Sequence, residues 1–369
     1  MNVAVIHDHF LHIGGAEKVL FALLNIFPTA DVYTALITQT NAEIIKQKTS
    51  GKIFVSWFNK INLTETTANL FKPFINTYWE SLDLTQYDLV ISSSHSFSAK
   101  SVITHPNTLH ISYIHTSPRY LYTEYNETRG INKGILKTLF SPFKTWLRMQ
   151  DFLGAQRPDV LIANSKAVQT RIRKYYRRES KVIYPPISIP KQVNFKKEKK
   201  YYLCVSRLVK QKGTELAIKA ANKLKFPLVI VGEGNKKNYL HSISGKTITF
   251  KGFVSETELT NIYAHAKALI YCSIDEDFGM VPVEALAHGV PVVAYNSGGV
   301  QETVIHGQTG ILFDKFTTEA LEKAIIEFER RDFTSKNCRK LTERFSEAMF
   351  KLKFKFLIAH FPKYSSDTI

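Results

Sequence analysis

Short apolar runs separated by polar or amphipathic stretches recur along almost the whole chain of 369 residues. Such runs are typical of buried strands, and apolar positions three or four apart between them are typical of helices. Strands alternating with helices predict an α/β protein built from doubly wound parallel sheets. The predicted strands are Asn2 to Ile6, Asp88 to Ser92, Leu109 to Ile114, Asp159 to Ala163, Lys181 to Tyr184, Tyr201 to Ser206, Pro227 to Val231, Thr247 to Phe250, Ala268 to Cys272, Pro291 to Ala294 and Gly310 to Phe313.

The alternation is interrupted once, near the middle of the chain. Pro185 and Pro186 end regular structure, and the charged run Lys196 to Lys200 is typical of a linker before the pattern restarts at Tyr201. The length suffices for two domains, each with its own core. We therefore predict domains at residues 1–186 and 187–348, followed by a helical segment at residues 349–369 with apolar positions such as Leu352 and Phe356.

The stretch from Ala268 to Thr303 holds the most specific pattern. A strand-like run stops at an acidic loop that contains Glu276, and Glu284 follows eight residues later inside a predicted helix. We expect both carboxylates to point into one cleft at the carboxyl end of the strand, where open α/β sheets bind ligands. Gly298 and Gly299 follow the next strand, where backbone amides without a nearby Cβ can close on a phosphate.

Two cations follow the strand predicted at Tyr201 to Ser206. Arg207 and Lys212 are five residues apart, and a guanidinium fork with a reaching ammonium suits a diphosphate. The first predicted strand also leads into a glycine turn, with Gly15 just before a helical pattern. Gly232-Glu233-Gly234 lacks the third glycine of a dinucleotide fingerprint, so we do not predict NAD binding there.

Two histidines lie beyond predicted strand ends in the N-terminal half. His95 falls in the Ser-rich stretch after Asp88 to Ser92, and His115 opens the segment after Leu109 to Ile114. A histidine in such a place can donate a hydrogen bond into a cleft, although it can equally cap or pack against its surroundings.

Taken together, the EDFG loop, Glu284, Gly289-Val290-Pro291 and Ser297-Gly298-Gly299 resemble the nucleotide-sugar half of glycosyltransferase family 4. That resemblance implies the GT-B fold, with two Rossmann-like domains facing across a cleft and a terminal helix crossing back to the N-terminal domain. It also implies a set of functional residues. Those expected in catalysis are His115, Glu276, Arg207 and Lys212; those expected to bind the donor are Gly15, Arg207, Lys212, Phe253, Val254, Gly279, Met280, Val281 and Glu284; those expected to bind the acceptor are His95, Arg119 and Tyr120.

By the same resemblance, Glu284 would hold the ribose hydroxyls and Glu276 the transferred sugar, in a retaining reaction by front-face attack. The residues Asp275-Glu276-Asp277 match a D-x-D metal signature superficially, but they are embedded in the EDFG loop. We therefore expect no metal site and no cofactor, since the two cations and backbone amides can take the charge of the leaving diphosphate.

The form of these motifs, with HTSPRYLY from His115 and VIYPP from Val182, most resembles bacterial mannosyltransferases of O-antigen and exopolysaccharide assembly. The resemblance implies GDP-mannose as the donor and a polyprenyl-diphosphate-linked saccharide as the acceptor. A transferase that uses a UDP-linked hexose and a GT-B sugar-nucleotide epimerase remain alternatives within the fold.

The net charge of +17 is concentrated in one part of the N-terminal half. Residues 129–181 hold 13 basic and 3 acidic side chains, whereas residues 1–128 hold 8 and 10. Phe143, Trp146, Leu147 and Leu153 lie at helical spacing within this basic segment, which is typical of a membrane-surface helix or of a helix packed in a core. We expect the segment to face an anionic membrane. A nucleic-acid-binding protein and a catalytically silent scaffold are the alternatives from other classes.

No apolar run approaches the length of a membrane span, and the N-terminus is typical of a first strand rather than of a signal peptide. The three cysteines, Cys204, Cys272 and Cys338, cannot pair completely, and no Cys/His spacing suggests zinc. We expect a cytoplasmic protein, peripheral on the inner face of the membrane, that does not bind nucleic acid.

Overall fold

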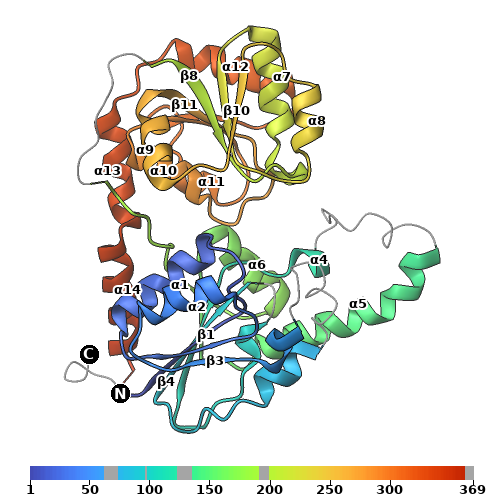
Figure 1. The fold of residues 1–369 in the computed structure, drawn as a ribbon, viewed down its shortest axis with the longest axis vertical. Helices are drawn as coiled ribbons and strands as arrows, with labels where there is room; N and C mark the ends of the chain where they lie inside the picture. Colours follow the sequence, from blue (N-terminus) through green and yellow to red (C-terminus); the bar gives the residue numbers. More distant parts are fainter. Residues whose placement is uncertain (62–73, 96–97, 123–134, 191–198, 362–369) are drawn as a thin grey trace. The chain divides into compact units, whose positions relative to one another are not determined.

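The computed structural model describes residues 1–61, 74–95, 98–122, 135–190 and 199–361. Contacts divide the chain into an N-terminal unit, Met1–Pro186 with Phe350–Ile369, and a C-terminal unit, Ile187–Met349. Most of the charged run Lys196 to Lys200, which was predicted as a linker, lies outside the described residues. Residues 129–134 of the basic segment also lie outside them. Each unit is built around one parallel sheet (Figure 1).

The sheet of the N-terminal unit has the strand order β3-β2-β1-β4-β5-β6-β7, and every pair is parallel. The order reverses between β1 and β4, which defines the switch point where open α/β sheets form ligand sites. The strands are β1 (Val3–His7), β2 (Asp31–Thr34), β3 (Ile53–Val55), β4 (Leu89–Ser94), β5 (Leu109–Ile114), β6 (Val160–Ala163) and β7 (Lys181–Val182).

Successive residues of β1 point to opposite faces of this sheet, and each face has its own core. Val3 and Val5 pack with α1 and with the end of α14, whereas Ala4 and Ile6 pack with η1 and with the helical residues 74–80. The helices of this unit are α1 (Gly15–Ile26), α2 (Gln39–Lys46), η1 (Trp57–Ile61), η2 (Ala99–Ser101), α4 (Arg119–Tyr122), α5 (Ile135–Gly154), α6 (Lys166–Tyr176) and α14 (Glu347–Ala359).

The terminal helix α14 belongs to the core of the N-terminal unit. Phe350, Phe354, Leu357 and Ile358 are buried there, in the same cluster as the inner residues of β1 and α1. The apolar positions Leu352 and Phe356 remain exposed.

The C-terminal unit repeats the plan with the order β10-β9-β8-β11-β12-β13, again entirely parallel. Here the order reverses between β8 and β11. Its strands are β8 (Tyr201–Val205), β9 (Leu228–Val231), β10 (Ile248–Gly252), β11 (Ala266–Tyr271), β12 (Val292–Tyr295) and β13 (Gly310–Phe313). Its helices are η3 (Lys210–Lys212), α7 (Thr214–Leu224), α8 (Lys237–Ser242), α9 (Glu256–His265), α10 (Met280–Ala287), α11 (Val300–Thr303), α12 (Thr318–Glu329), α13 (Ser335–Thr342) and η4 (Glu343–Phe345).

The predicted strands are all present, but β2 and β3 were not predicted. The strand β2 is a four-residue segment, DVYT, with polar ends, and β3 is a three-residue edge strand whose Phe54 and Val55 are 36% exposed. β2 holds two apolar residues and β3 only three, so both runs are too short to stand out in the sequence.

Candidate functional site

The loop after β11 holds Glu276 at the switch point of the C-terminal sheet. Three donors converge on its Oε2: Lys212 Nζ at 2.6 Å, Tyr271 OH at 2.7 Å and Ser273 Oγ at 2.6 Å. Lys212 reaches it from the loop after β8, so the pair spans the two strands at which the strand order reverses. The Oε1 atom makes no hydrogen bond with any residue that the structure describes.

These contacts fix the charge of Glu276. Burial raises the pKa of the carboxyl, but the charge of Lys212 and the three hydrogen bonds outweigh it and hold the pKa at about 2. Burial and the neighbouring carboxylate raise the pKa of Tyr271 well above its ordinary value. Glu276 is therefore an anion at neutral pH and acts as an acceptor of hydrogen bonds, not as a proton donor.

The two glycines after β12 make a close backbone contact that the sequence did not predict. The Gly299 N–H donates to the carbonyl oxygen of Glu276 at 2.8 Å, so this one amide already has a partner, while the expected phosphate contact of the Gly298 amide stays a prediction. A Cβ on Gly298, at φ +61°, would lie 2.1 Å from that same oxygen. Glycine is required here because the loop after β12 lies directly against the loop that carries Glu276.

The loop after β8 is held in a similar way. Gly213 follows Lys212 with φ +63°, and a Cβ there would meet the carbonyl oxygen of Cys272 at 2.3 Å. Arg207 precedes this turn; its side chain is exposed and makes no hydrogen bond or ion pair with the described part of the chain. A cation in this state can bind an anion without breaking an existing contact.

The other predicted donor-binding residues are distributed over the same edge of the sheet. Glu284 is half-buried in the second turn of α10, which Gly279 precedes with φ +89° and which begins with Met280 and Val281. Its negative charge contributes to raising the pKa of the buried Tyr263, after burial itself. Phe253 and Val254 follow β10; Val254 packs against the core, whereas Phe253 is 88% exposed.

The N-terminal unit gathers histidines at its own switch point. His115 Nε2 lies 2.8 Å from Ser93 Oγ, and His7 Nδ1 lies 3.0 Å from the same oxygen. His95 is close by, with its ring centroid 6.2 Å from that of His115, and its backbone N–H donates to Asp8 Oδ2. The structure therefore brings His95 and His115 close together, beside His7 at the end of β1 and Ser93 in β4.

Burial dominates the electrostatics of this cluster. It lowers the pKa of His115 to about 3, with further lowering by the neighbouring rings of His95 and His7. His9, whose ring centroid is 4.7 Å from that of His95, has its pKa lowered to about 3 for the same reasons. Both rings are neutral at pH 7, so His115 is able to hydrogen-bond a ligand but carries no charge.

Gly15 is the first residue of α1, and the helix start beside it is already capped. The Gly14 N–H donates to Glu17 Oε2 at 2.7 Å, and Glu17 Oε1 lies 3.4 Å from His7 Nε2. The ligand atoms of His7, Glu17 and His95 lie within 4.8 Å of one another. A divalent ion can therefore be placed there geometrically, although no metal site was predicted at these residues.

Arg119 and Tyr120 lie in the short helix α4 that follows His115, and both are half-buried. Burial raises the pKa of Tyr120, and the negative charges of Asp151 and Asp8 raise it further. The backbone oxygen of His115 accepts a hydrogen bond from Asn164 Nδ2 at 2.8 Å, which fixes this segment at the carboxyl end of β5.

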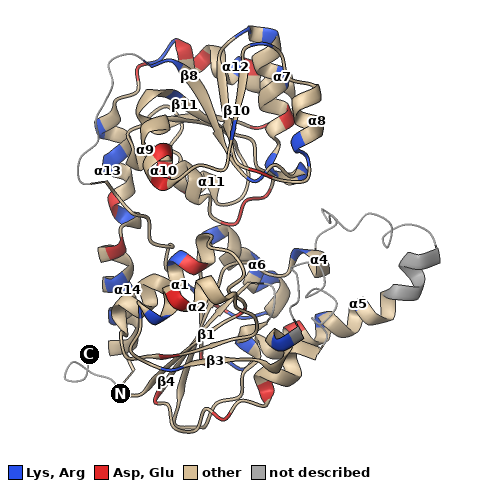
Figure 2. Cartoon of the chain, in the orientation of Figure 1, with Lys and Arg blue, Asp and Glu red and all other residues tan. Residues whose placement is uncertain are grey.

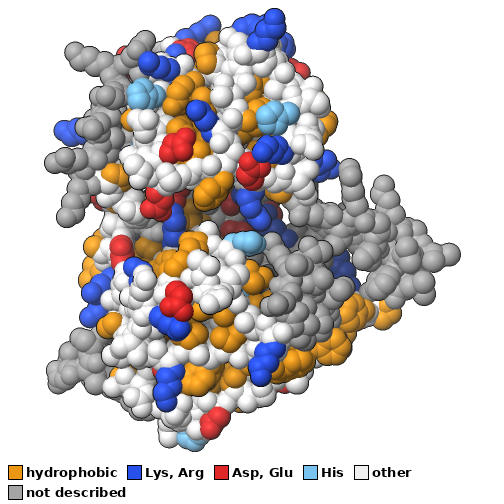
Figure 3. Space-filling model, viewed as in Figure 1, with side chains coloured by type: hydrophobic (Ala, Val, Ile, Leu, Met, Phe, Trp, Pro, Cys, Tyr) orange, Lys and Arg blue, Asp and Glu red, His pale blue; other side chains and the backbone are white. Residues whose placement is uncertain are grey.

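The base of α5 is anchored by a buried ion pair that sequence reasoning missed. Lys100 Nζ lies 2.5 Å from Asp151 Oδ1, both side chains are 2% exposed, and Tyr122 OH donates to Asp151 Oδ2. Further along α5, Phe143, Trp146, Met149, Phe152 and Leu153 are between 37% and 57% exposed. These side chains, which we call the α5 apolar face, are not core residues, and Figure 3 shows apolar side chains gathered over this part of the molecule.

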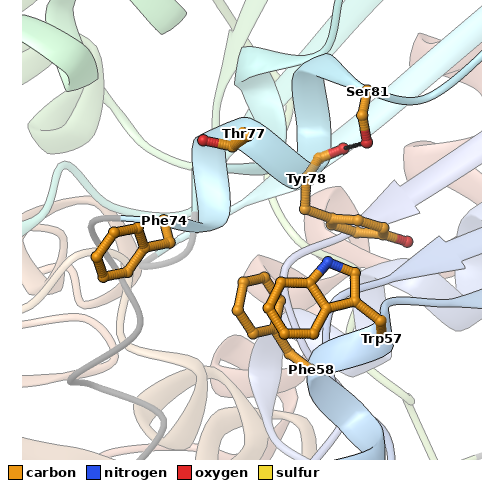
Figure 4. A pocket seen from close by; sticks show the side chains of 6 residues that line it. All are labelled: Trp57, Phe58, Phe74, Thr77, Tyr78 and Ser81. Carbon is orange, nitrogen blue, oxygen red and sulfur yellow. Dashed lines mark hydrogen bonds between the residues drawn. The ribbon is translucent and has the colours of Figure 1, made fainter.

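A separate apolar pocket of about 540 Å³ lies elsewhere in the N-terminal unit (Figure 4). It is lined by Trp57, Phe58, Phe74, Thr77, Tyr78 and Ser81. None of these side chains carries a charge at neutral pH, so the pocket lacks the groups that would bind a diphosphate. The candidate functional residues are accordingly those of the two polar clusters, one at the switch point of each sheet.

Comparison with known proteins shows which families the two units resemble. The family model described as Glycosyltransferase Family 4 matches residues 13–189, and the one described as Glycosyl transferases group 1 matches residues 187–349. An uncharacterised 41.2 kDa protein in the cps region of Klebsiella pneumoniae is 29% identical over 214 residues, which are 49% of this chain and 58% of that protein.

A GDP-mannose-dependent α-(1-6)-phosphatidylinositol monomannoside mannosyltransferase of Mycobacterium tuberculosis is 33% identical over 147 residues, 35% of this chain and 38% of that protein. The chain spans about half the length of the first curated relatives that it matches. Among solved structures, Anabaena HepE in complex with UDP and glucose superposes with a TM-score of 0.71 at 20% identity, covering 97% of this chain and 99% of that one. The likeness confirms the expected GT-B fold of two Rossmann-like domains.

Proposed function

This chain belongs to glycosyltransferase family 4, and we propose that it is a retaining hexosyltransferase that transfers mannose from GDP-mannose to a saccharide carried on polyprenyl diphosphate. The observation that carries the proposal is the arrangement around Glu276. A carboxylate held rigid and charged by Lys212, Tyr271 and Ser273 lies at the switch point of the C-terminal sheet, with the exposed cation Arg207 on the neighbouring loop.

The chemistry follows from these groups. Arg207 and Lys212 bind the diphosphate, and Glu276 Oε1 accepts a hydrogen bond from a hydroxyl of the donor sugar while Glu284 holds the ribose. The bond between the anomeric carbon and the phosphate oxygen breaks as the acceptor hydroxyl attacks the same face, and the acceptor proton passes to the leaving phosphate. Positive charge on the two side chains stabilises the departing diphosphate, so we propose that the reaction needs neither a metal ion nor a cofactor.

The identity of the nucleotide-sugar donor is a separate part of the proposal. The mycobacterial relative is named as GDP-mannose-dependent, and its match covers 35% of this chain. The HepE structures contain UDP, glucose or UDP-glucose, which makes a UDP-linked hexose the second candidate. Donor selection between these two depends on the base and the sugar, whereas Arg207 binds only the diphosphate that both donors share.

The acceptor side of the proposal rests on α5 and α6 of the N-terminal unit. The α5 apolar face is exposed, and Lys144 and Arg148 lie between its members in the sequence. Figure 2 marks the positions of the basic residues along the ribbon of α6. Apolar side chains at helical spacing with flanking cations favour an anionic membrane surface. No helix among the described residues is both long and apolar enough to cross a membrane. We therefore propose peripheral attachment on the cytoplasmic side, close to a lipid-linked acceptor, and no nucleic-acid partner.

The proposal is tested by a transfer assay on the full chain with radiolabelled GDP-mannose, UDP-glucose and UDP-galactose, in the presence of EDTA. Lipid-linked saccharides extracted from bacterial membranes serve as acceptors, and the anomeric configuration of the product is read by NMR. Transfer from GDP-mannose with retention is the expected result, and transfer from a UDP-sugar would move the assignment to the second candidate. Conversion of the sugar nucleotide without any acceptor would indicate an epimerase instead.

Membrane attachment is tested separately by sedimentation with phosphatidylglycerol vesicles. The triple variant Trp146→Ser, Met149→Ser, Leu153→Ser is expected to stay in the supernatant where the wild type pellets. The matched control is Leu352→Ser, Phe356→Ser, which removes two exposed apolar side chains of α14 and should pellet like the wild type. Binding to oligonucleotides but not to vesicles would contradict the membrane proposal.

A further inference from the structure

Three side chains that can ligate a metal ion meet at the switch point of the N-terminal sheet. They are His7 at the end of β1, Glu17 in the first turn of α1 and His95 just after β4. One ligand atom of each lies within 4.8 Å of the other two. His7 is fully buried, Glu17 is 5% exposed and the side chain of His95 is 17% exposed. No second group of histidine, cysteine, aspartate and glutamate side chains converges in this way in the part of the chain that the structure describes.

The separation between His7 and Glu17 suits two ligands of one ion better than it suits a hydrogen bond. His7 Nε2 lies 3.4 Å from Glu17 Oε1. Hydrogen bonds from nitrogen to oxygen are usually about 2.7–3.2 Å long. A tetrahedral Zn²⁺ ion holds nitrogen and oxygen ligands at about 2.0–2.1 Å, which places any two of them about 3.4 Å apart. His95, the most exposed of the three, is the ligand that has to adjust, because its atom lies within 4.8 Å of the others.

The two buried ligands are oriented through their second polar atoms. His7 Nδ1 lies 3.0 Å from Ser93 Oγ, and these two residues are opposite each other in the register of β1 and β4. Glu17 Oε2 accepts the Gly14 N–H at 2.7 Å. Metal-binding histidines and carboxylates are usually held in this way, by a partner on the atom that does not bind the ion. His7 and Glu17 are therefore fixed with Nε2 and Oε1 beside each other.

The third ligand has a carboxylate beside it. Asp8 is fully buried; its Oδ2 accepts the backbone N–H of His95 at 2.8 Å and lies 3.8 Å from Nδ1 of the ring. The ligand set is thus two imidazoles and one carboxylate. Such a set suits Zn²⁺ and other first-row transition metals, whereas Mg²⁺ and Ca²⁺ take oxygen ligands.

We propose that His7, Glu17 and His95 bind one Zn²⁺ ion, with water in the fourth position that three protein ligands leave on a tetrahedral ion. The ion links β1, α1 and the segment after β4, so it stabilises the N-terminal unit. It also takes up His95, which is expected to bind the acceptor, so a filled site inhibits transfer; this consequence alone rests on the proposed function. The ion has no part in the chemistry of transfer, which uses groups of the C-terminal unit.

The site is tested by calorimetric titration of Zn²⁺ into the full chain, after treatment with EDTA and dialysis. We expect one site per chain. Glu17→Gln should lose at least about 100-fold in affinity, because a neutral amide oxygen is a weak ligand, and it keeps an oxygen for the Gly14 N–H at the helix start. Ser93→Ala removes only the contact to His7 Nδ1 and should lose about 10- to 100-fold. The control Glu43→Gln, at an exposed glutamate of α2, should bind like the wild type. Equal affinity in wild type and Glu17→Gln overturns the proposal.

Co²⁺ in place of Zn²⁺ reports the ligands directly. Four nitrogen and oxygen ligands give intense visible bands without a thiolate charge-transfer band. His95→Gln, which changes a partly exposed side chain and replaces Glu17→Gln should that variant fail to fold, should abolish them. A thiolate band would place the ion on a cysteine and overturn the proposal, and so would the weak bands of an octahedral ion.

Stability and activity give two further readouts. Zn²⁺ should raise the melting temperature followed by tryptophan fluorescence, because all three tryptophans lie in the N-terminal unit; no rise with the site filled would overturn the stabilising role. In the transfer assay, Zn²⁺ should inhibit the wild type, EDTA should restore the rate, and Glu17→Gln should resist inhibition. Transfer at full rate with Zn²⁺ bound would overturn the inferred loss of acceptor binding. Absence of transfer under every condition would refute the proposed function, while calorimetry and the Co²⁺ spectrum still decide the metal site.

Discussion

Replacing Lys212 by methionine tests the role assigned to its ion pair with Glu276. The substitution keeps most of the side-chain volume and removes the ammonium that lies 2.6 Å from the carboxylate. Glu276 then retains only the hydroxyl donors Tyr271 and Ser273. We expect two separate consequences, a less stable C-terminal unit and weaker binding of a nucleoside diphosphate.

The magnitude follows from the pKa of Glu276. Burial raises it, yet Lys212 and the hydrogen bonds bring it from 4.5 to about 2, and that difference corresponds to about 3 kcal/mol of preference for the charged form. Lys212 is the largest of the lowering causes, and both side chains are at most 20% exposed, so solvent screens the pair only partly. We expect the variant to lose about 2–3 kcal/mol, or about 5–10 °C in the melting temperature of a unit of this size.

The assay relies on the positions of the tryptophans in the two units. Trp57, Trp79 and Trp146 all lie in the N-terminal unit, so tryptophan fluorescence follows that unit, whereas circular dichroism follows both. The variant should lower the melting temperature seen by circular dichroism and leave the fluorescence transition in place. The control Lys267→Met removes an ammonium 2.5 Å from Glu329, at the amino end of β11 and on the opposite edge of the sheet.

The stabilising contribution of the Glu276–Lys212 pair must depend on pH in one direction. Because the folded-state pKa of Glu276 is lowered, its stabilising contribution is complete above pH 4.5 and is lost as the pH falls toward 2. The difference between wild type and Lys212→Met should therefore be full at pH 7 and shrink below pH 4.5. If Lys212→Met melts like Lys267→Met at pH 7 and binds nucleoside diphosphates as the wild type does, the reasoning about this pair is wrong.

Three further predictions concern other parts of the molecule. Gly298→Ala should weaken nucleotide binding because its Cβ would lie 2.1 Å from a backbone oxygen. The control Gly307→Ala, at φ +77° with a flexible arginine as its nearest contact, should lose only about 1 kcal/mol of stability through backbone strain. Calorimetric titration with a nucleotide distinguishes the two variants. Asp151→Asn leaves the buried charge of Lys100 without its ion-pair partner and should destabilise the N-terminal unit by about 3–5 kcal/mol. Denaturant unfolding followed by tryptophan fluorescence measures this loss. The double variant Lys100→Met, Asp151→Leu should recover most of it. Burial and two nearby arginines lower the pKa of His110 to about 3, so the fluorescence-detected melting temperature should fall as the pH drops from 6.5 toward 3, and should fall less steeply in His110→Gln.

Much of the fold could be predicted because its central strands are buried on both faces. β1, β4, β5 and β11 are almost entirely buried, so each is rich in apolar residues over four or more positions of the sequence. The edge strand β3 is apolar but only three residues long and largely exposed, so it does not stand out in the sequence. The boundary between the contact-defined units lies at Pro186 and Ile187, beside the proline pair that the sequence offers as a break.

The site could be predicted only where a motif is local. The spacing of Arg207 and Lys212 and the EDFG loop are visible in the sequence, and the structure joins Lys212 to Glu276 across the switch point. The hydroxyls of Tyr271 and Ser273 that hold Glu276 have no distinctive signal, although both flank the end of a predicted strand. The cluster that includes His115 joins β1 to β4 across 86 positions of the sequence, and only the register of the sheet brings His7 and Ser93 together. At Gly298 and Gly299 the close approach of two backbone segments gives the same glycine signature that a phosphate-binding turn would give, so the sequence alone does not separate the two.

Thermal-shift titration tests directly whether the C-terminal unit binds a nucleoside diphosphate without a metal ion. GDP, UDP, ADP and their sugar conjugates are compared on the wild type and on Glu284→Ala, with and without EDTA. A ligand present at 100 times its dissociation constant stabilises the fold by about 2.7 kcal/mol, so specific binding is readily detected. We expect a shift with GDP compounds that EDTA leaves intact and Glu284→Ala abolishes. A shift that requires a metal ion, or no shift with any nucleotide, would contradict this expectation.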